Sequence, residues 1–196
     1  MLDGPNNAHK TFAGLKWIGE RVDGAEFDEC VFDHCLFGGS AFEHCRFTSC
    51  RFVSCDLSNI KVTTSRFRDT QFESTKLLGL DWTKAEGMTD PHANTALSFV
   101  DCVLDLSSFF GLNLHSATIE RCSAKEADFG EADLQEAICR RTDFAGARFH
   151  GTNLERADFR DALNYVIDPR ANRVKGARFS LPEAVALLRG LDIVIE

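Results

Sequence analysis

The chain has 196 residues, of which 44% are hydrophobic, and it carries a formal net charge of −8. A negative balance of this size disfavours direct binding to nucleic acid, because phosphate backbones attract basic surfaces. The sequence contains no run near the roughly 18 apolar residues that a membrane-spanning helix needs. Its N-terminus lacks the basic and then apolar order of a signal peptide. We therefore expect a cytoplasmic protein that binds neither membrane nor nucleic acid.

A period of five residues runs through the sequence. From Phe12 to Trp82 every fifth residue is large and apolar, and the period resumes at Phe99 and runs to Phe159. It fits neither an α-helix, at about 3.6, nor a flat strand, at about 2, so it indicates a structural repeat. The residue two positions before each large one is usually small, as at Cys30. We predict that both positions point inward and that five residues form one side of a coil.

Three repeat units show the pattern most clearly: Ala127-Asp128-Phe129, Ala132-Asp133-Leu134 and Ala157-Asp158-Phe159. These units resemble the pentapeptide-repeat family, with cysteine in place of alanine through much of the N-terminal half. The resemblance covers nearly the whole chain. It implies an all-β fold, a right-handed quadrilateral (four-sided) parallel β-helix, which a short C-terminal capping helix would complete.

A four-sided coil predicts that residues twenty apart stack above one another. Layers in a β-solenoid are spaced by about 4.8 Å, which allows aromatic rings to stack in offset rows. The same residue type recurs every twenty positions in four predicted columns: Phe12, Phe32, Phe52 and Phe72; Phe27, Phe47 and Phe67; Phe109, Phe129 and Phe149; Leu114, Leu134 and Leu154. Aromatic columns are therefore expected to replace a globular core.

Eight cysteines fit the same scheme, seven in the small inward position and Cys139 in the large one. We expect buried free thiols, because an enclosed cysteine behaves as a small apolar residue and a cytoplasmic compartment is reducing. The six histidines are scattered and do not gather the ligands that zinc requires, so no metal or other cofactor is expected. The chain has no phosphate loop or catalytic motif, and its carboxylates lie on a convex wall, so an enzyme is not expected.

The repeat is interrupted once. We predict an N-terminal tail over 1–11, one β-helix over 12–180 with a loop at 83–96, and a C-terminal helix and strand over 181–196. Trp82 and Phe99 lie 17 residues apart, which either distorts several sides or inserts a loop of 12 extra residues. We favour a functional loop because glycine and proline punctuate this segment; a tolerated insertion is the alternative. The residues expected to bind a partner there are Lys84, Glu86, Met88, Asp90 and His92.

The sequence after Phe179 predicts a different ending. Ser180 and Glu183 form a capping-box pattern with Pro182 in the first turn, so a helix is expected to cover the open end of the coil. The last residues alternate as a short strand, which favours a two-fold dimer through this end; docking onto its own chain is the alternative. The residues expected at the dimer interface are Leu181, Val185, Leu188, Leu191, Ile193 and Ile195.

The ending also narrows the resemblance. The segment from Arg178 to Ala184, with Leu187-Leu188, Leu191-Asp192-Ile193 and the preceding Ala162-Leu163-Asn164-Tyr165, is similar to the albicidin-immunity branch, relatives of the Qnr and MfpA groups. This resemblance implies a homodimeric rod that mimics duplex DNA and binds DNA gyrase, a type II topoisomerase. Such proteins inhibit gyrase, protect it from poisons such as quinolones or albicidin, or do both, and so give antibiotic resistance. The alternative is a non-catalytic scaffold for an unrelated protein partner.

Acidic residues are densest near the N-terminal end of the predicted coil, at Glu20, Asp23, Glu26, Asp28, Glu29 and Asp33. Elsewhere positive and negative residues are mixed along predicted columns: Glu26, Arg46 and Arg66; Asp101, Arg121, Arg141 and Asp161. Such ladders relieve repulsion between layers, so a uniform phosphate-like surface is not expected.

Overall fold

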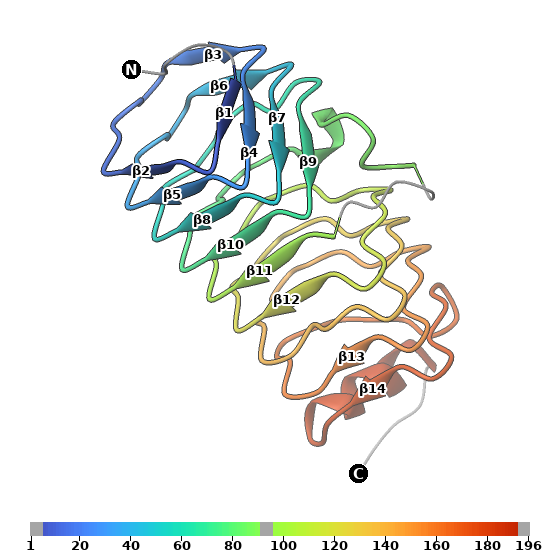
Figure 1. The fold of residues 1–196 in the computed structure, drawn as a ribbon. Helices are drawn as coiled ribbons and strands as arrows, with labels where there is room; N and C mark the ends of the chain where they lie inside the picture. Colours follow the sequence, from blue (N-terminus) through green and yellow to red (C-terminus); the bar gives the residue numbers. More distant parts are fainter. Residues whose placement is uncertain (1–5, 91–95, 192–196) are drawn as a thin grey trace.

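The five-residue units form the wall of a four-sided parallel β-helix in the computed structural model of the protein (Figure 1). The structure describes residues 6–90 and 96–191, with side chains as far as Leu188. About eight coils follow one another along the axis. Each side is a short strand or bridge whose central residue points inward, as in β5 (Val31–Asp33), where only Phe32 is fully buried. Inward burial of one large residue per side explains the period of five.

We label the four sides A to D in the order in which the chain passes along them. Side A consists of β1 (Asn6–Ala8), β4 (Glu26–Asp28), β7 (Arg46–Thr48) and β9 (Arg66–Arg68). Side B consists of β2 (Thr11–Ala13), β5, β8 (Arg51–Val53), β10 (Gln71–Glu73), β11 (Ser98–Val100) and β12 (Thr118–Glu120), and continues through a bridge to β13 (Asp158–Phe159) and β14 (Arg178–Phe179). Side D begins with β3 (Arg21–Asp23) and β6 (Ala41–Glu43). Isolated parallel bridges hold side C, from Lys16 with Leu36 to Asp143 with Leu163.

The predicted aromatic columns are present inside the coil. On side B the ring centroids of Phe32 and Phe52 are 4.6 Å apart, and those of Phe52 and Phe72 are 5.1 Å apart. On side D the rings of Phe109 and Phe129 are 4.9 Å apart and nearly parallel. These centroid distances lie near the inter-strand spacing and within the range of offset stacking. The backbone ladder and the ring columns therefore share one repeat distance.

The interruption adds seven residues to one coil, fewer than the 12 expected. β10 pairs with β11 in the register of Phe72 with Phe99, which lies 27 positions further on instead of twenty. The difference arises because residues 86–88 still belong to side A: the N–H of Glu86 bonds to Ser65, the carbonyl oxygen of Met88 accepts the N–H of Asn113, and Met88 is fully buried. One more side thus belongs to the wall, and the seven extra residues lie between Glu86 and Leu97 in the sequence.

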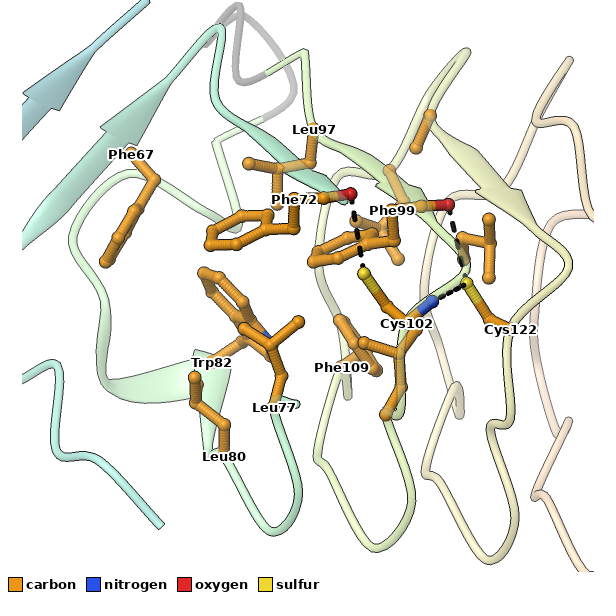
Figure 2. Close-up of a cluster of buried hydrophobic side chains, with 14 of the residues drawn as sticks. Phe67, Phe72, Leu77, Leu80, Trp82, Leu97, Phe99, Cys102, Phe109 and Cys122 are labelled. Carbon is orange, nitrogen blue, oxygen red and sulfur yellow. Dashed lines mark hydrogen bonds between the residues drawn. The ribbon is translucent and has the colours of Figure 1, made fainter. Parts of the chain in front are cut away.

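Trp82 continues the aromatic packing across the register shift. It opens the single-turn 3-10 helix η1 (Trp82–Lys84) and is fully buried. Its ring meets Phe67, Phe72 and Phe99 edge-on, with centroids 5.2, 5.8 and 5.7 Å away (Figure 2). Phe72 and Phe99 stack on each other at 5.2 Å. The core therefore stays continuous although the chain outside it is longer.

Polar side chains in the small inward position bind the backbone of the neighbouring coil. Cys122 Sγ donates to the carbonyl oxygen of Phe99 at 3.4 Å and accepts the backbone N–H of Cys102 at 3.4 Å (Figure 2). Thr75 Oγ1 likewise donates to the carbonyl oxygen of Phe52 at 3.2 Å. Cysteine, serine and threonine therefore satisfy buried backbone groups near the corners, in addition to filling space as alanine does. All eight cysteines are buried and free.

Most corners hold one residue in the left-handed backbone conformation. Between sides B and C these residues are Gly14, His34, Ser54, Ser74, Asp101, Arg121, Arg141 and Asp161. The conformation is disfavoured for L-residues and is best tolerated by glycine and by short polar side chains. Within the described part of the chain, Leu106 is the one large apolar residue that adopts it, with φ of 61°.

The two ends of the coil differ from the expected boundaries. The wall begins at β1, ahead of Phe12, and Asn7 takes the large inward position there. At the other end η2 (Glu183–Leu191) is a 3-10 helix, and its Ala186 and Leu187 pack against the core. The helix predicted for this end is therefore present, although its hydrogen bonding is that of a tighter helix.

The predicted capping box at this helix does not form. Ser180 Oγ accepts the backbone N–H of Asp161 at 3.1 Å and donates to Asp161 Oδ1 at 3.3 Å, so it connects the start of the helix to the preceding coil. η2 extends through Leu191, where a strand was expected to begin. Ile193 and Ile195 lie outside the described residues.

Replacing Phe129 with alanine should destabilise the protein by about 3–5 kcal/mol, because the buried ring would leave a cavity between two stacked rings. Phe110→Ala, at an exposed position of side D, should cost less than about 1 kcal/mol. Urea denaturation followed by circular dichroism measures both. Equal losses would contradict the inward and outward assignment of these two phenylalanines.

Candidate partner-binding surfaces

Two of the five residues predicted to bind a partner through the loop belong to the wall of the coil. Glu86 lies directly above Arg66 and forms an ion pair with it, which lowers the pKa of Glu86. Met88 faces the interior and is fully buried, so it is not available to a partner. The prediction that Met88 contacts a partner was therefore wrong. The interruption of the five-residue period made it impossible to see from the sequence that Met88 points inward.

The other predicted loop residues are at the surface or outside the described part of the chain. Lys84 is exposed at the end of η1, with Nζ 3.8 Å from the Asp81 carboxylate. Asp90 is exposed, and its carbonyl oxygen accepts a hydrogen bond from Asn113 Nδ2 at 3.1 Å. His92 lies outside the described residues. Of the five residues predicted to contact a partner, the structure therefore places Lys84, Glu86 and Asp90 at the surface.

The acidic residues of the first coils spread around the rod and do not gather on one face. Glu20 and Asp23 belong to side D, Glu26 and Asp28 to side A, Glu29 to the corner that follows, and Asp33 to side B. Four of them have partners within hydrogen-bonding distance: Asp23 with His44 at 2.8 Å, Glu26 with Arg46 at 2.7 Å, Glu29 with His9 at 3.1 Å and Asp33 with His34 at 2.7 Å. Negative charge therefore surrounds these coils, and much of it is locally compensated.

The predicted charge ladders are present between coils. Arg121 donates two hydrogen bonds to Asp101, from Nε at 2.8 Å and from Nη2 at 3.0 Å. Further along the same column, Arg141 Nε lies 3.8 Å from Asp161. Opposite charges twenty residues apart thus attract each other across the coils, as they do across neighbouring strands.

Among the described residues, Asp158 on side B is the most enclosed carboxylate. Arg140 contacts its Oδ2 through Nε at 2.8 Å, and Arg160 contacts both carboxylate oxygens, at 2.9 and 2.7 Å. The side chain of Asp158 is 9% exposed. Hydrogen bonds from Arg160 and then from Arg140 hold the pKa of Asp158 far below its usual range. Both guanidinium groups are therefore fixed on this side.

An exposed apolar surface lies at the C-terminal end of the rod. Of the predicted interface residues, Leu181 is 80% exposed and Val185 is also exposed, whereas Leu188 is half-buried. Val166 is 64% exposed and lines, with Val185, an open groove of about 610 Å³. The side chain of Leu191 lies outside the described residues, as do Ile193 and Ile195. The described apolar residues therefore gather beside η2.

A second apolar surface, which the sequence did not predict, lies on side D. Leu106 and Phe110 are 58% and 44% exposed. A signal was available for Phe110, because the period of five assigns Phe109 to the interior and so places the next residue outward. No signal marked Leu106, because the need for a left-handed residue at each corner emerges only from the backbone of the folded coil.

The buried Cys50 thiol is a poor nucleophile. Burial raises the pKa of the Cys50 thiol to about 12, which disfavours the thiolate that would attack a substrate or bind a metal. Over residues 6–90 and 96–191, no group of three or more histidine, cysteine, aspartate or glutamate side chains is arranged to hold a metal ion. In the same ranges no helix has the length and apolarity to cross a membrane.

Family models match both halves of the coil. A model described as a pentapeptide repeat region matches residues 25–88, and a model of pentapeptide repeats in eight copies matches residues 125–161. Together they cover more than half of the chain. The chain therefore belongs to the pentapeptide-repeat family.

The chain is similar to solved structures of other proteins. A trypsin-treated variant of QnrB1, a plasmid-mediated fluoroquinolone resistance protein, is 18% identical, covers 95% of this chain and 99% of its own, and has a TM-score of 0.55. HetL from the cyanobacterium Nostoc, a pentapeptide repeat protein involved in heterocyst differentiation regulation, is 17% identical, covers 90% and 87%, and has a TM-score of 0.44. No curated protein matches the chain in sequence. The likeness to QnrB1 shows a shared fold.

Asp158→Asn should destabilise the protein by about 1–2 kcal/mol at pH 7, because two arginines lose a charged acceptor. The folded-state pKa of Asp158 is lowered, so its contribution is present above the unfolded value near 3.9 and is lost as the pH falls below it. The difference between wild type and variant should therefore shrink below about pH 4.

Thermal unfolding at a series of pH values measures this effect. Glu136→Gln is the control, because Glu136 pairs with Arg156 at 2.7 Å in an exposed position where solvent weakens the interaction. A constant difference between wild type and Asp158→Asn from pH 7 to pH 3 would contradict the assigned role of the carboxylate.

Proposed function

We propose that this protein binds DNA gyrase as a mimic of duplex DNA, and that it inhibits the enzyme, protects it from poisons such as quinolones or albicidin, or does both. It would act in the cytoplasm as a binding protein and not as an enzyme, and it would confer antibiotic resistance. The main support is the fold that it shares with QnrB1, a fluoroquinolone resistance protein, over nearly the full length of both chains.

Shape and charge support the same proposal. Stacked coils give a rod with a constant cross-section, and the chain carries a net charge of −8. A negatively charged rod fits a basic groove that otherwise receives DNA, whereas it repels DNA itself. The target we propose is therefore the topoisomerase and not its nucleic-acid substrate.

We also propose that two copies join through their C-terminal ends. Leu181, Val166 and Val185 are exposed beside η2, and burying apolar surface of this kind favours association. A two-fold dimer would double both the length of the rod and its net charge. A longer rod would present more negatively charged surface to a DNA-binding groove.

One observation favours the alternative, a scaffold for an unrelated protein partner. Many outward carboxylates are paired with arginine or histidine, as Glu26 is with Arg46 and Asp101 with Arg121, so the surface differs from a uniform row of phosphates. A scaffold would need no such row. Functional assays with gyrase separate the two proposals.

Purified protein should reduce supercoiling by DNA gyrase, or reduce the cleavage complexes that a quinolone or albicidin stabilises, in a concentration-dependent manner. Relaxation of the same plasmid by a type I topoisomerase is the control, because a protein that acted by coating DNA would inhibit both enzymes. Absence of any effect on supercoiling, cleavage complexes or gyrase binding would refute the proposal and favour the scaffold.

Leu181→Asp combined with Val185→Asp should convert a dimer into a monomer, because two buried carboxylates would oppose association. Light scattering should then give the mass of one chain. Ile18→Asp is the matched control, because Ile18 is 63% exposed near the opposite end. If the double variant remains a dimer, the interface lies elsewhere.

A further inference from the structure

Leu106 and Phe110 form an exposed apolar patch on one coil of side D, which we call the side D patch. The two residues flank Ser108, which bridges to Asp128 in the next coil. They are 58% and 44% exposed, while Phe109 between them is fully buried. The patch lies on the wall of the rod, so it is separate from the apolar surface beside η2.

Leu106 occupies a backbone position that does not suit it. It has φ of 61°, and its side chain can make no local hydrogen bond that would favour this conformation. The other residues of the same corner column are Gly19, Gly39, Asn59, Gly79, Glu126 and Gly146. A large apolar side chain is thus held outward where glycine predominates, and neither backbone preference nor burial explains it.

The ring of Phe110 lies close to Gly130, where the absence of a side chain leaves room for it. A Cβ added at Gly130 would come within 3.1 Å of Phe110 Cδ2 and 3.2 Å of its Cε2, so a larger residue would displace the ring. Gly130 does not have a positive φ, and its backbone therefore does not require glycine. The missing side chain accommodates the ring against the wall and leaves its other face open to a partner.

The coil beneath the patch is strongly acidic. Residues 118–137 contain six acidic residues and two basic ones. Glu126 stacks below Leu106, and Glu131 occupies the next corner of side D; both are exposed, and neither forms an ion pair within the described part of the chain. The nearby cations are already paired, Arg148 with Asp128 at 2.9 Å and Lys125 with Asp143 at 3.3 Å.

We propose that the side D patch is a contact site for a basic protein surface that presents an aliphatic or aromatic side chain. Leu106 and Phe110 would pack against that side chain, and Glu126 and Glu131 would pair with lysine or arginine around it. This arrangement, an apolar centre with a charged rim, is typical of specific protein interfaces. The inference rests on the proposed function, since it assigns this surface to gyrase.

The test uses the full-length protein and purified gyrase, with affinity measured by biolayer interferometry. Leu106→Gly combined with Phe110→Ala should weaken binding at least about tenfold, because apolar anchors near the centre of an interface dominate affinity. Leu106→Gly installs the residue that the corner prefers, so misfolding would not explain the loss. Ile18→Ala, at an equally exposed apolar residue, should change affinity less than about twofold.

A second pair of variants tests the charged rim. Glu131→Gln should weaken binding and reduce its dependence on salt, whereas Glu136→Gln should not, because Glu136 is already paired with Arg156. Each variant removes one charge from the same coil, so net charge is matched.

The outcomes separate this inference from the proposed function. If wild-type protein does not bind gyrase, the proposed function fails and the assignment of the patch fails with it. If wild type binds and the patch variants bind equally well, the patch is refuted while the proposed function stands. If the patch variants instead convert a dimer into a monomer in light scattering, side D is an interface between two copies and the assignment to gyrase is wrong.

Discussion

Hydrogen bonding between successive coils is the constraint on which the rest of the structure depends. The backbone groups of each side pair with the coil above and the coil below, so every side must keep the same length and direction. A five-residue unit meets this condition, because a three-residue side and a two-residue corner repeat without drift. The insertion after Glu86 is compatible with it, since the ladder resumes with Phe72 opposite Phe99.

The interior follows from the same constraint. Layers at the inter-strand spacing bring identical inward positions close enough for rings to stack, which favours phenylalanine above phenylalanine. The small inward position faces backbone groups near the corners, so cysteine, serine and threonine bond there in addition to filling space. Rigid coils also place each outward charge near the charge twenty residues away, as in the pair of Arg121 with Asp101. A core of this kind leaves only the outer surface for recognition.

The outer surface differs between regions of the rod. Paired charges dominate where arginines and carboxylates alternate, and such pairs limit repulsion between layers without creating a strong field. Exposed apolar side chains depart from this rule, among them those of the end beside η2 and of the side D patch of Leu106 and Phe110. Both expose apolar side chains that the core does not need.

The fold could be predicted from the sequence because its repeat is local: a large residue every five positions determines what points inward, and spacing by twenty determines what stacks. Membership of the aromatic columns, the buried thiols and the charge ladders followed from that spacing. The position of Met88 did not, because a shifted register hides the inward row until the ladder on both sides of the insertion is known. The C-terminal end also differed from the prediction. Ser180 hydrogen-bonds to Asp161 in the preceding coil and not to the helix that follows it. The sequence by itself thus determined the repeat and its core, whereas the tertiary structure decided which surfaces are free, because corner conformation and contacts between coils arise only when the coils are stacked.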